Sequence, residues 1–82
     1  MFHVYIIQSE KTNRYYTGFT DNPERRLHEH NSGENPSTRN KGPWKLVYHE
    51  SFETRSEAMK RECEIKSKKS SKSIQRIIEY NK

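Results

Sequence analysis

Arg26 and His30 are the first residues whose types and spacing could do chemistry. They lie four positions apart, so on a helix they would project from the same face. Two cationic or hydrogen-bond-donating groups at this spacing could hold a phosphate, because arginine offers a planar pair of donors to its oxygens. The alternative is a surface helix with scattered charge, since Arg25, His28 and Glu29 surround the pair.

Glu62 is a carboxylate at a position where a helix is expected to carry an apolar residue. Ala58 lies four residues before it and Ile65 three after it, and with Met59 these positions form the expected inward stripe of a helix. A buried carboxylate is costly unless a metal or a cation meets it. Glu62 is therefore either a metal ligand at the edge of a sheet or the partner of a nearby lysine or arginine. A third alternative is that the helix is rotated, so that Glu62 does not belong to the inward stripe.

Tyr5 and Tyr16 are a third candidate pair. Aromatic residues are common in strands, so each tyrosine taken alone is more simply a strand former. A free phenol has a pKa of about 10, and a tyrosine that accepts a proton near neutrality needs help from cations or a metal-bound water. Their joint placement with Arg26, His30 and Glu62 is what would give them a chemical role.

The net charge of +5 is concentrated at the end of the chain. Residues 66–82 hold six bases and one acid, which leaves ten charges of each sign in residues 1–65. A cationic segment on a small protein indicates a polyanionic partner, and nucleic acid more than a membrane. The alternative is a solvated helix face that maintains solubility. The candidate nucleic-acid-binding residues are Lys68, Lys69 and Lys72 of this segment, together with Arg39 and Lys41 of the polar stretch 33–43.

Length and composition exclude several classes of protein. A chain of 82 residues, of which 28% are hydrophobic, has only a small core and room for neither a second domain nor an enclosed cofactor cavity. We therefore expect one domain over residues 1–82 and a site on its surface. No run of apolar residues approaches a membrane span and no signal-peptide layout is present, which favours a cytoplasmic location. The single cysteine, Cys63, excludes an internal disulfide and gives no zinc-ligand spacing.

The elements that would position these residues alternate between strands and helices. The pattern predicts two strands over 2–7 and 15–19, a helix from 22–24 to about 31, a strand over 44–49, a helix beginning at 54–56 and a last helix from about 71. Asn22 or Asp21 would cap the first helix, with Pro23 at its first position. The last helix would bury Ile74, Ile77 and Ile78. This β-β-α-β-α-α order predicts an α+β fold, a small three-stranded antiparallel sheet flanked by helices.

The register of the first two strands follows from their apolar residues. Phe2, Val4 and Ile6 should share a face with Tyr15 and Phe19, which requires paired positions to sum to an odd number. A connection of about six residues would pair Ile6 with Tyr15 and Tyr5 with Tyr16. The two phenols would then lie side by side on the other face of the sheet.

Together, these residues resemble the GIY-YIG nuclease superfamily, in particular its small UPF0213-like members related to the nuclease module of the excinuclease C subunit. His3-Val4-Tyr5 stands at the first signature and Tyr16-Thr17-Gly18 at the second, with the two tyrosines 11 residues apart. Arg26 follows Gly18 by eight residues, and the segment 56–62 is similar to the family's second helix. Two departures are that only the tyrosine of the first signature is present and that Thr17 replaces isoleucine in the second.

The resemblance implies a role for each of the five residues. Glu62 would bind a single Mg²⁺ or Mn²⁺, Tyr5 would activate the attacking water with Tyr16 in support, Arg26 would brace the scissile phosphate, and His30 would orient it or assist proton transfer. The implied activity is metal-dependent endonucleolytic hydrolysis of nucleic acid, DNA more than RNA, in repair or processing and without a small-molecule cofactor. The alternative is a module that holds nucleic acid on a nuclease fold without cutting it.

Overall fold

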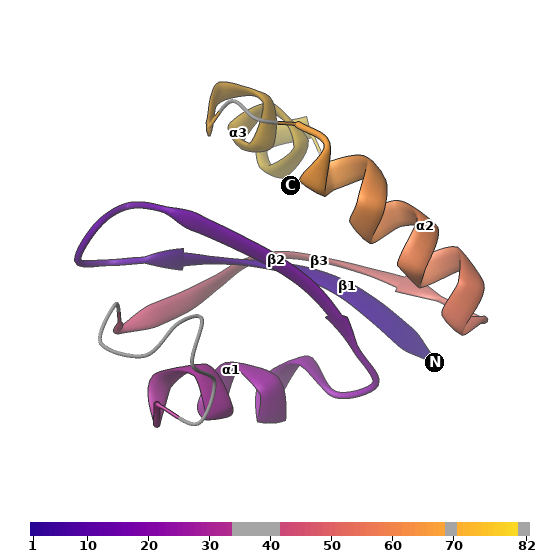
Figure 1. Cartoon of the computed structure of the whole chain (residues 1–82), viewed down its shortest axis with the longest axis horizontal. Coiled ribbons are helices and arrows are strands. Elements are labelled where there is room, and N and C mark those ends of the chain that lie inside the picture. The colour runs from indigo at the N-terminus through magenta and orange to yellow at the C-terminus, as the bar shows by residue number, and fades with distance from the viewer. Residues whose placement is uncertain (34–41, 69–70, 81–82) are drawn as a thin grey trace.

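The computed structural model describes residues 1–33, 42–68 and 71–80. Its elements follow the predicted order, and β1 lies in the middle of one antiparallel sheet of order β2-β1-β3 (Figure 1). This confirms the predicted α+β fold with a three-stranded sheet. The element bounds are β1 Phe2–Ser9, β2 Tyr15–Thr20, α1 Pro23–Asn31, β3 Trp44–Phe52, α2 Arg55–Lys66 and α3 Ser71–Tyr80.

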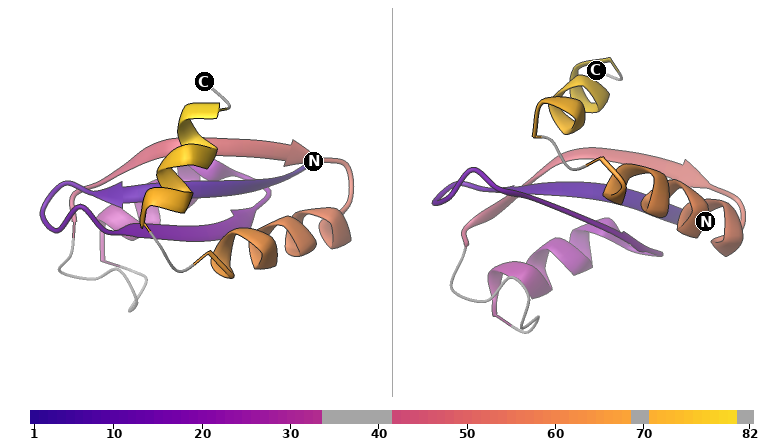
Figure 2. Two further views of the ribbon diagram at one scale, coloured as in Figure 1. Left: turned by 90° about the horizontal axis from the view of Figure 1, so that it is seen from above. Right: turned by 45° about the horizontal axis from the view of Figure 1, so that its top comes forward.

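The helices cover both faces of the sheet. Helix α1 lies on one face, and α2 and α3 lie on the other (Figures 1 and 2). Alternate residues of β1 therefore enter two cores. Val4 and Ile6 pack with Ala58 and Ile65 of α2, whereas Tyr5 and Ile7 belong to the core that includes Leu27 of α1. This double coverage explains why the whole run from Val4 to Ile7 is buried although period-two alternation usually marks a strand with one wet face.

The paired positions of β1 and β2 sum to an odd number, as predicted. Each residue of β1 nevertheless lies opposite a residue of β2 that is two positions later than predicted. Val4 faces Phe19 and Tyr5 faces Gly18, whereas Tyr16 faces Ile7. The predicted direct pairing of Tyr5 with Tyr16 is therefore wrong, although both tyrosines belong to the same face. The two phenols instead come from diagonal positions of the β1–β2 pair.

A tight turn causes this displacement. The Ser9 N–H donates to the Arg14 carbonyl at 2.9 Å, and the Ser9 hydroxyl accepts from the backbone N–H groups of Lys11 and Thr12 at 3.1 and 3.0 Å. Asn13 takes the left-handed conformation with φ 62°, which asparagine tolerates better than most residues. These bonds let the ladder continue to Ser9, so the connection is shorter than predicted.

Helix α1 begins and ends with asparagine side chains that satisfy backbone groups. The Asn22 side chain accepts from the Arg25 N–H at 3.1 Å and Pro23 follows at the first helical position, as the capping pattern predicts. At the other end, Asn31 accepts from the Trp44 N–H at 2.6 Å and donates to the Trp44 carbonyl at 3.0 Å. The end of α1 is thereby held against the start of β3.

Helix α3 packs on the sheet through the three isoleucines predicted from its sequence. Ile74, Ile77 and Ile78 are partly buried against the core that contains Val4 and Ile6. Within the described residues, neither α3 nor any other helix has the length and apolar character needed to cross a membrane.

Candidate active site

Tyr5 crosses the edge strand of the sheet at a glycine. The residue is 2% exposed and lies opposite Gly18 of β2. A Cβ atom built on Gly18 would lie 2.5 Å from the Tyr5 hydroxyl oxygen and 2.8 Å from its Cζ. No other residue type leaves this space free, because every other side chain begins with a Cβ. The glycine of the segment 16–18 therefore makes room for the phenol.

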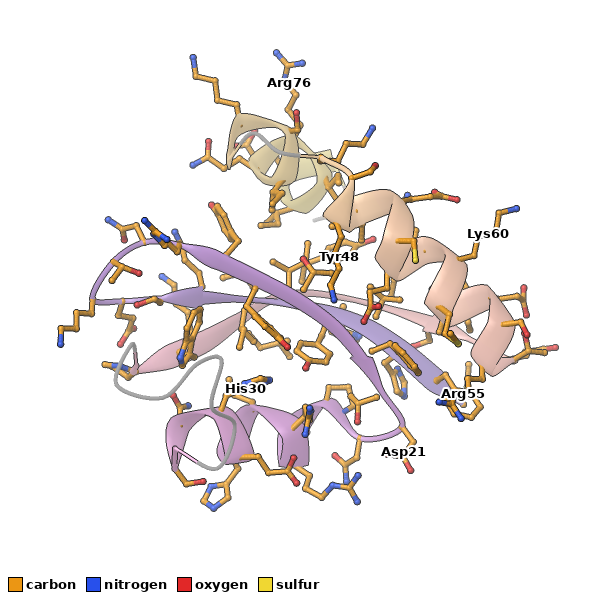
Figure 3. The ribbon with its side chains drawn as sticks, viewed as in Figure 1. Asp21, His30, Tyr48, Arg55, Lys60 and Arg76 are labelled. Carbon is orange, nitrogen blue, oxygen red and sulfur yellow. The ribbon has the colours of Figure 1, made fainter. Side chains whose placement is uncertain are left out.

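The Tyr5 hydroxyl meets His30 of α1. Their Oη and Nε2 atoms are 3.0 Å apart, and His30 is 1% exposed. Figure 3 shows the His30 side chain directed from α1 towards the sheet. The ring of Tyr16 contacts the same imidazole edge-on, with centroids 5.0 Å apart. Two tyrosines of the hairpin and one histidine of the helix thus form a single cluster, in which Tyr5 and His30 are buried and Tyr16 is partly buried.

Burial holds the pKa of His30 below its ordinary value, and the nearby Arg26 guanidinium lowers it further, against a smaller opposing effect of Glu29. The imidazole is therefore neutral at pH 7. A neutral imidazole has one unprotonated nitrogen, and with the proton on Nδ1 the Nε2 atom accepts a hydrogen bond from Tyr5. The contact is a path along which the phenol can pass its proton to the histidine.

Arg26 lies one helical turn before His30 and projects with it, as their four-residue spacing predicts, and both side chains interact with Tyr5. Its Nη1 donates to the Glu29 carboxylate at 2.9 Å, and its side chain is 38% exposed. Burial raises the pKa of Tyr5 above its ordinary value, whereas a hydrogen bond from Arg26 and its positive charge lower it. Burial is the larger effect, so Tyr5 is a protonated phenol at neutral pH.

Glu62 approaches this cluster from the opposite face of the sheet. Its side chain is 16% exposed, and its carboxylate lies 3.6 Å from Nζ of Lys66, one turn later on α2. Burial is the main reason for the raised pKa of Tyr5, but the charge of Glu62 contributes to it. The carboxylate therefore acts electrostatically on the phenol although the two residues come from different layers.

The predicted inward stripe of α2 is partly wrong. Ala58 and Ile65 are fully buried, but Met59 is 44% exposed. The buried line of the helix runs through positions 58 and 65, two turns apart, and this rotation leaves Met59 in solvent and Glu62 at the boundary of the core. Glu62 is thus a mostly buried carboxylate beside a lysine, which is the paired alternative, and its charge also acts on the phenol of Tyr5.

The pattern of the GIY-YIG catalytic domain family matches residues 1–75 of the chain. The chain belongs to this family. It is 48% identical over 68 residues to a UPF0213 protein of Halobacterium salinarum, covering 80% of this chain and 86% of that one. It is 44% identical over 78 residues to a UPF0213 protein of Clostridium perfringens, covering 94% and 83% of the two chains.

A solved structure has the same fold as this GIY-YIG domain. The solution NMR structure of a UPF0213 protein from Bacillus halodurans is 33% identical in sequence and aligns with a TM-score of 0.62. The alignment covers 98% of this chain and 85% of that chain. The family expected from the segments 3–5, 16–18 and 56–62 is therefore confirmed.

The candidate site has few groups that could hold a metal ion. Nowhere in residues 1–33, 42–68 and 71–80 do three histidine, cysteine, aspartate or glutamate side chains converge. Among the five candidate residues Tyr5, Tyr16, Arg26, His30 and Glu62, only Glu62 carries a carboxylate, so it would be the ligand that they offer. A Mg²⁺ or Mn²⁺ ion fits such a site, because hard ions of this kind are commonly bound by one or two carboxylates together with water and substrate phosphate.

The predicted cationic residues are only partly placed. Lys68 follows the end of α2 and Lys72 lies in the first turn of α3, and both are exposed. Arg39, Lys41 and Lys69 fall outside the residues that the structure describes.

Two contributors to the site were not identified from the sequence. Gly18 was quoted only as part of a motif, and Glu29, the partner of Arg26, could have been found from its three-residue spacing on the helix.

Proposed function

We propose that this chain is a single-domain, metal-dependent endonuclease that hydrolyses phosphodiester bonds in DNA, in repair or processing. The observation that carries the proposal is the convergence of His30 and Arg26 on the hydroxyl of Tyr5 at the gap left by Gly18. The same residues belong to a chain of the GIY-YIG catalytic domain family. A buried phenol in contact with a neutral imidazole and a guanidinium is suited to moving a proton next to an anionic substrate.

Tyr5 would act as a proton relay between the attacking water and His30. The phenol is protonated at neutral pH, so it can accept a proton only as it gives up its own. The water oxygen attacks phosphorus, the water proton moves to Tyr5 Oη, and the phenolic proton moves along the 3.0 Å contact to His30 Nε2. The bond from phosphorus to the 3′ oxygen breaks, and that oxygen takes a proton from solvent.

Tyr16 would support this relay by fixing the imidazole. Its ring meets His30 at an interplanar angle of 60°, an edge-to-face arrangement that limits rotation of the imidazole. Tyr16 contacts the imidazole through its ring, whereas the Tyr5 hydroxyl contacts Nε2 of His30 directly at 3.0 Å. We therefore assign the relay to Tyr5 and the support to Tyr16.

Arg26 and Glu62 would bind the two sides of the substrate phosphate. Arg26 uses Nη1 for Glu29, which leaves donors on its other nitrogens for a phosphate oxygen. Glu62 would hold the single divalent ion, which when bound stabilises the charge that develops on the phosphate and the leaving oxygen. The carboxylate must then exchange its contact with Lys66 for the ion.

The test is incubation with labelled single-stranded, duplex and branched DNA in Mg²⁺ or Mn²⁺, with a chelator control. Metal-dependent cuts that EDTA abolishes would support the proposal. A salt-sensitive shift of the DNA without cuts would instead identify a non-cleaving nucleic-acid-binding module. Neither cuts nor a shift would contradict both and leave a protein-interaction adaptor.

A further inference from the structure

A pocket lies along the edge of the sheet, next to the candidate active site. We call it the edge pocket, and its volume is about 270 Å³. Figure 2 shows the end of α2 and the beginning of α3 lying next to β2, the edge strand. The pocket is lined by residues 15–17 of β2, Ile65 and Lys66 of α2, Lys68, and Ile74 of α3.

The edge pocket shares residues with the proposed catalytic cluster. Tyr16 lines the pocket, and its ring stands 5.0 Å from that of His30. Lys66 also lines the pocket and lies 3.6 Å from the Glu62 carboxylate. A strand whose scissile phosphate lies between Arg26 and Glu62 would therefore have its next nucleotide at this pocket.

The chemistry of the lining suits one nucleotide. Tyr15, Ile65 and Ile74 provide an aromatic ring and two apolar side chains, and Lys66 and Lys68 provide two ammonium groups. Proteins that bind single strands combine these parts, with bases packed on aromatic rings and lysines on the phosphates. Among the described residues, none that lines the edge pocket is acidic, and the carboxylate of Glu62 contacts Lys66 from outside that lining.

The size of the edge pocket favours an unpaired nucleotide over a base pair. Its volume of about 270 Å³ is just below the range of about 300–1,000 Å³ that holds drug-sized ligands. A base that remains paired in a duplex brings its partner and its stacked neighbours with it, and these have no room in the pocket. A base without a partner can turn towards Tyr15.

We propose that the edge pocket binds one unpaired nucleotide of a DNA strand next to the scissile phosphate, with its base against Tyr15 and Ile74 and its phosphate on Lys66 and Lys68. This inference rests on the proposed function for the position of the scissile phosphate. It identifies the substrate as single-stranded DNA or DNA with an unpaired segment at the cut.

Binding without metal tests the base contact. Fluorescence anisotropy in EDTA compares a labelled single strand with a blunt duplex of the same sequence. Tyr15→Leu removes the ring but keeps an apolar side chain, and it should weaken single-strand binding roughly 5- to 100-fold, as loss of one stacked base does. It should leave duplex binding within about two-fold. Phe19→Leu is the matched control, because Phe19 faces the same side of β2 but does not line the pocket.

A lysine variant keeps the test decisive if Tyr15→Leu impairs folding. Lys68→Gln changes an exposed side chain and should weaken single-strand binding about two- to five-fold at low salt, as the loss of one phosphate contact does. Lys60→Gln is the control, because this lysine points away from the sheet (Figure 3). Equal effects of the two lysine variants, or equal effects of Tyr15→Leu on single strand and duplex, would overturn the proposal.

The two proposals fail in different ways. If the protein cuts DNA with Mn²⁺ but Tyr15→Leu and Lys68→Gln bind single strands like the wild type, the edge pocket is refuted and the nuclease assignment stands. If both variants bind single strands weakly but no substrate is cut, the edge pocket stands as a site for an unpaired nucleotide, whereas the nuclease assignment and the neighbouring scissile phosphate are refuted. Absence of any DNA binding would refute both.

Discussion

The hydroxyl oxygen of Tyr5 lies only 2.5 Å from the point where a side chain at Gly18 would begin. Tyr5 stands in the central strand and Gly18 opposite it in the edge strand. The phenol can reach past the edge of the sheet only because position 18 has no Cβ. This relationship explains why a glycine stands at the second signature: the absence of a side chain at position 18 lets the hydroxyl of Tyr5 reach His30.

Gly18→Ala should therefore affect both stability and activity. Tyr5 is 2% exposed, and a Cβ on residue 18 would lie 2.5 Å from its hydroxyl oxygen, so atoms must shift to accommodate the substitution. We expect a loss of about 1–3 kcal/mol in the free energy of unfolding, as in other overpacked cores. We also expect a fall in cleavage on the order of 10²-fold, because displacing the hydroxyl breaks its contact with His30. Urea unfolding and single-turnover cleavage measure the two effects.

A second substitution locates the cause in the Tyr5 hydroxyl. In a Tyr5→Phe background the nearest atom to the new Cβ is absent, so Gly18→Ala should cost less stability there than in the wild type. Gly42→Ala is the glycine control, since its new Cβ would lie 3.4 Å from its nearest neighbour, and it should change stability by less than about 0.5 kcal/mol. Equal losses from Gly18→Ala in both backgrounds would contradict this explanation.

Glu62→Gln should abolish metal-dependent cleavage while leaving the fold intact. The amide keeps the shape of the side chain but loses the charge that a hard divalent ion requires. Within residues 1–33, 42–68 and 71–80, the ion pair lost is the 3.6 Å contact with a half-exposed lysine, Lys66, so stability should change by less than about 1 kcal/mol. Cleavage assays in Mn²⁺ and thermal unfolding measure both quantities.

Glu64→Gln is the matched control for this carboxylate. Glu64 lies on the same helix, is 51% exposed and pairs with Arg61, away from Tyr5. Its neutralisation should leave cleavage unchanged. Cleavage by Glu62→Gln at the wild-type rate would refute the assignment of Glu62 as the metal ligand.

Arg26→Ala and Tyr5→Phe should each lower turnover on the order of 10²-fold or more, as loss of a transition-state contact does. Arg25→Ala is the control for the arginine. Arg25 precedes Arg26 in the same helix, but it is 58% exposed and pairs with Asp21 at 3.0 Å. Near-wild-type turnover in both Arg26→Ala and Tyr5→Phe would leave the cluster with a structural role only.

His30 should make stability depend on pH on the acid side. Burial first, and then the charge of Arg26, lower the pKa of His30 in the folded state. The unfolded chain therefore takes up its proton first as the pH falls below about 6.5. This contribution to stability is complete above pH 6.5 and is lost as the pH falls towards the lower pKa of the folded state. Urea unfolding between pH 5 and 8 measures it.

The variant His30→Gln should remove this acid-side loss, because the amide does not titrate. His28→Gln, which changes an exposed histidine on the same helix, should retain it. The relay predicts the same direction for activity, since only neutral His30 can accept the proton of Tyr5. If the pH dependence of His30→Gln were identical to that of the wild type, His30 would not be its source.

The fold could be predicted from local patterns, whereas the geometry of the site depends on contacts across layers. Asn22 with Pro23 marks the start of α1 in the sequence itself. The apolar residues of the first two strands likewise show which of their side chains share a face of the sheet. The exact register depends on the hydrogen bonds of Ser9 and the left-handed Asn13, which periodicity does not encode. The rotation of α2 that exposes Met59 is likewise set by packing on the sheet.

Two features of the site show the same limit. The four-residue spacing of Arg26 and His30 predicts that they project together, but it does not show that they meet Tyr5 from another element. Gly18 reads as a turn or bulge residue in a strand, and only the position of the Tyr5 ring shows why it is needed. Residue types indicate which chemistry is available, and tertiary contacts decide which groups can share a proton.

The uneven charge of the chain leads to the last prediction. The whole excess of +5 lies in residues 66–82, whereas Tyr5, Tyr16, Arg26, His30 and Glu62 all lie before it. Replacing Lys68, Lys69 and Lys72 by glutamine should therefore weaken DNA binding while leaving the saturated rate nearly unchanged. For single-stranded DNA, the slope of log K against log salt should become shallower by up to about 2, because three phosphate contacts are lost.

A second triple variant separates this effect from net charge alone. It also removes three positive charges, but from positions outside the segment 66–82: Lys11, Lys45 and Lys60. Its binding and its salt slope should stay close to those of the wild type if the segment itself contacts the phosphates. Equal weakening by both triple variants would show a general electrostatic attraction instead. Collapse of the saturated rate in the first variant would show that the cationic segment and the catalytic cluster act as one unit, because affinity and turnover would then depend on the same lysines.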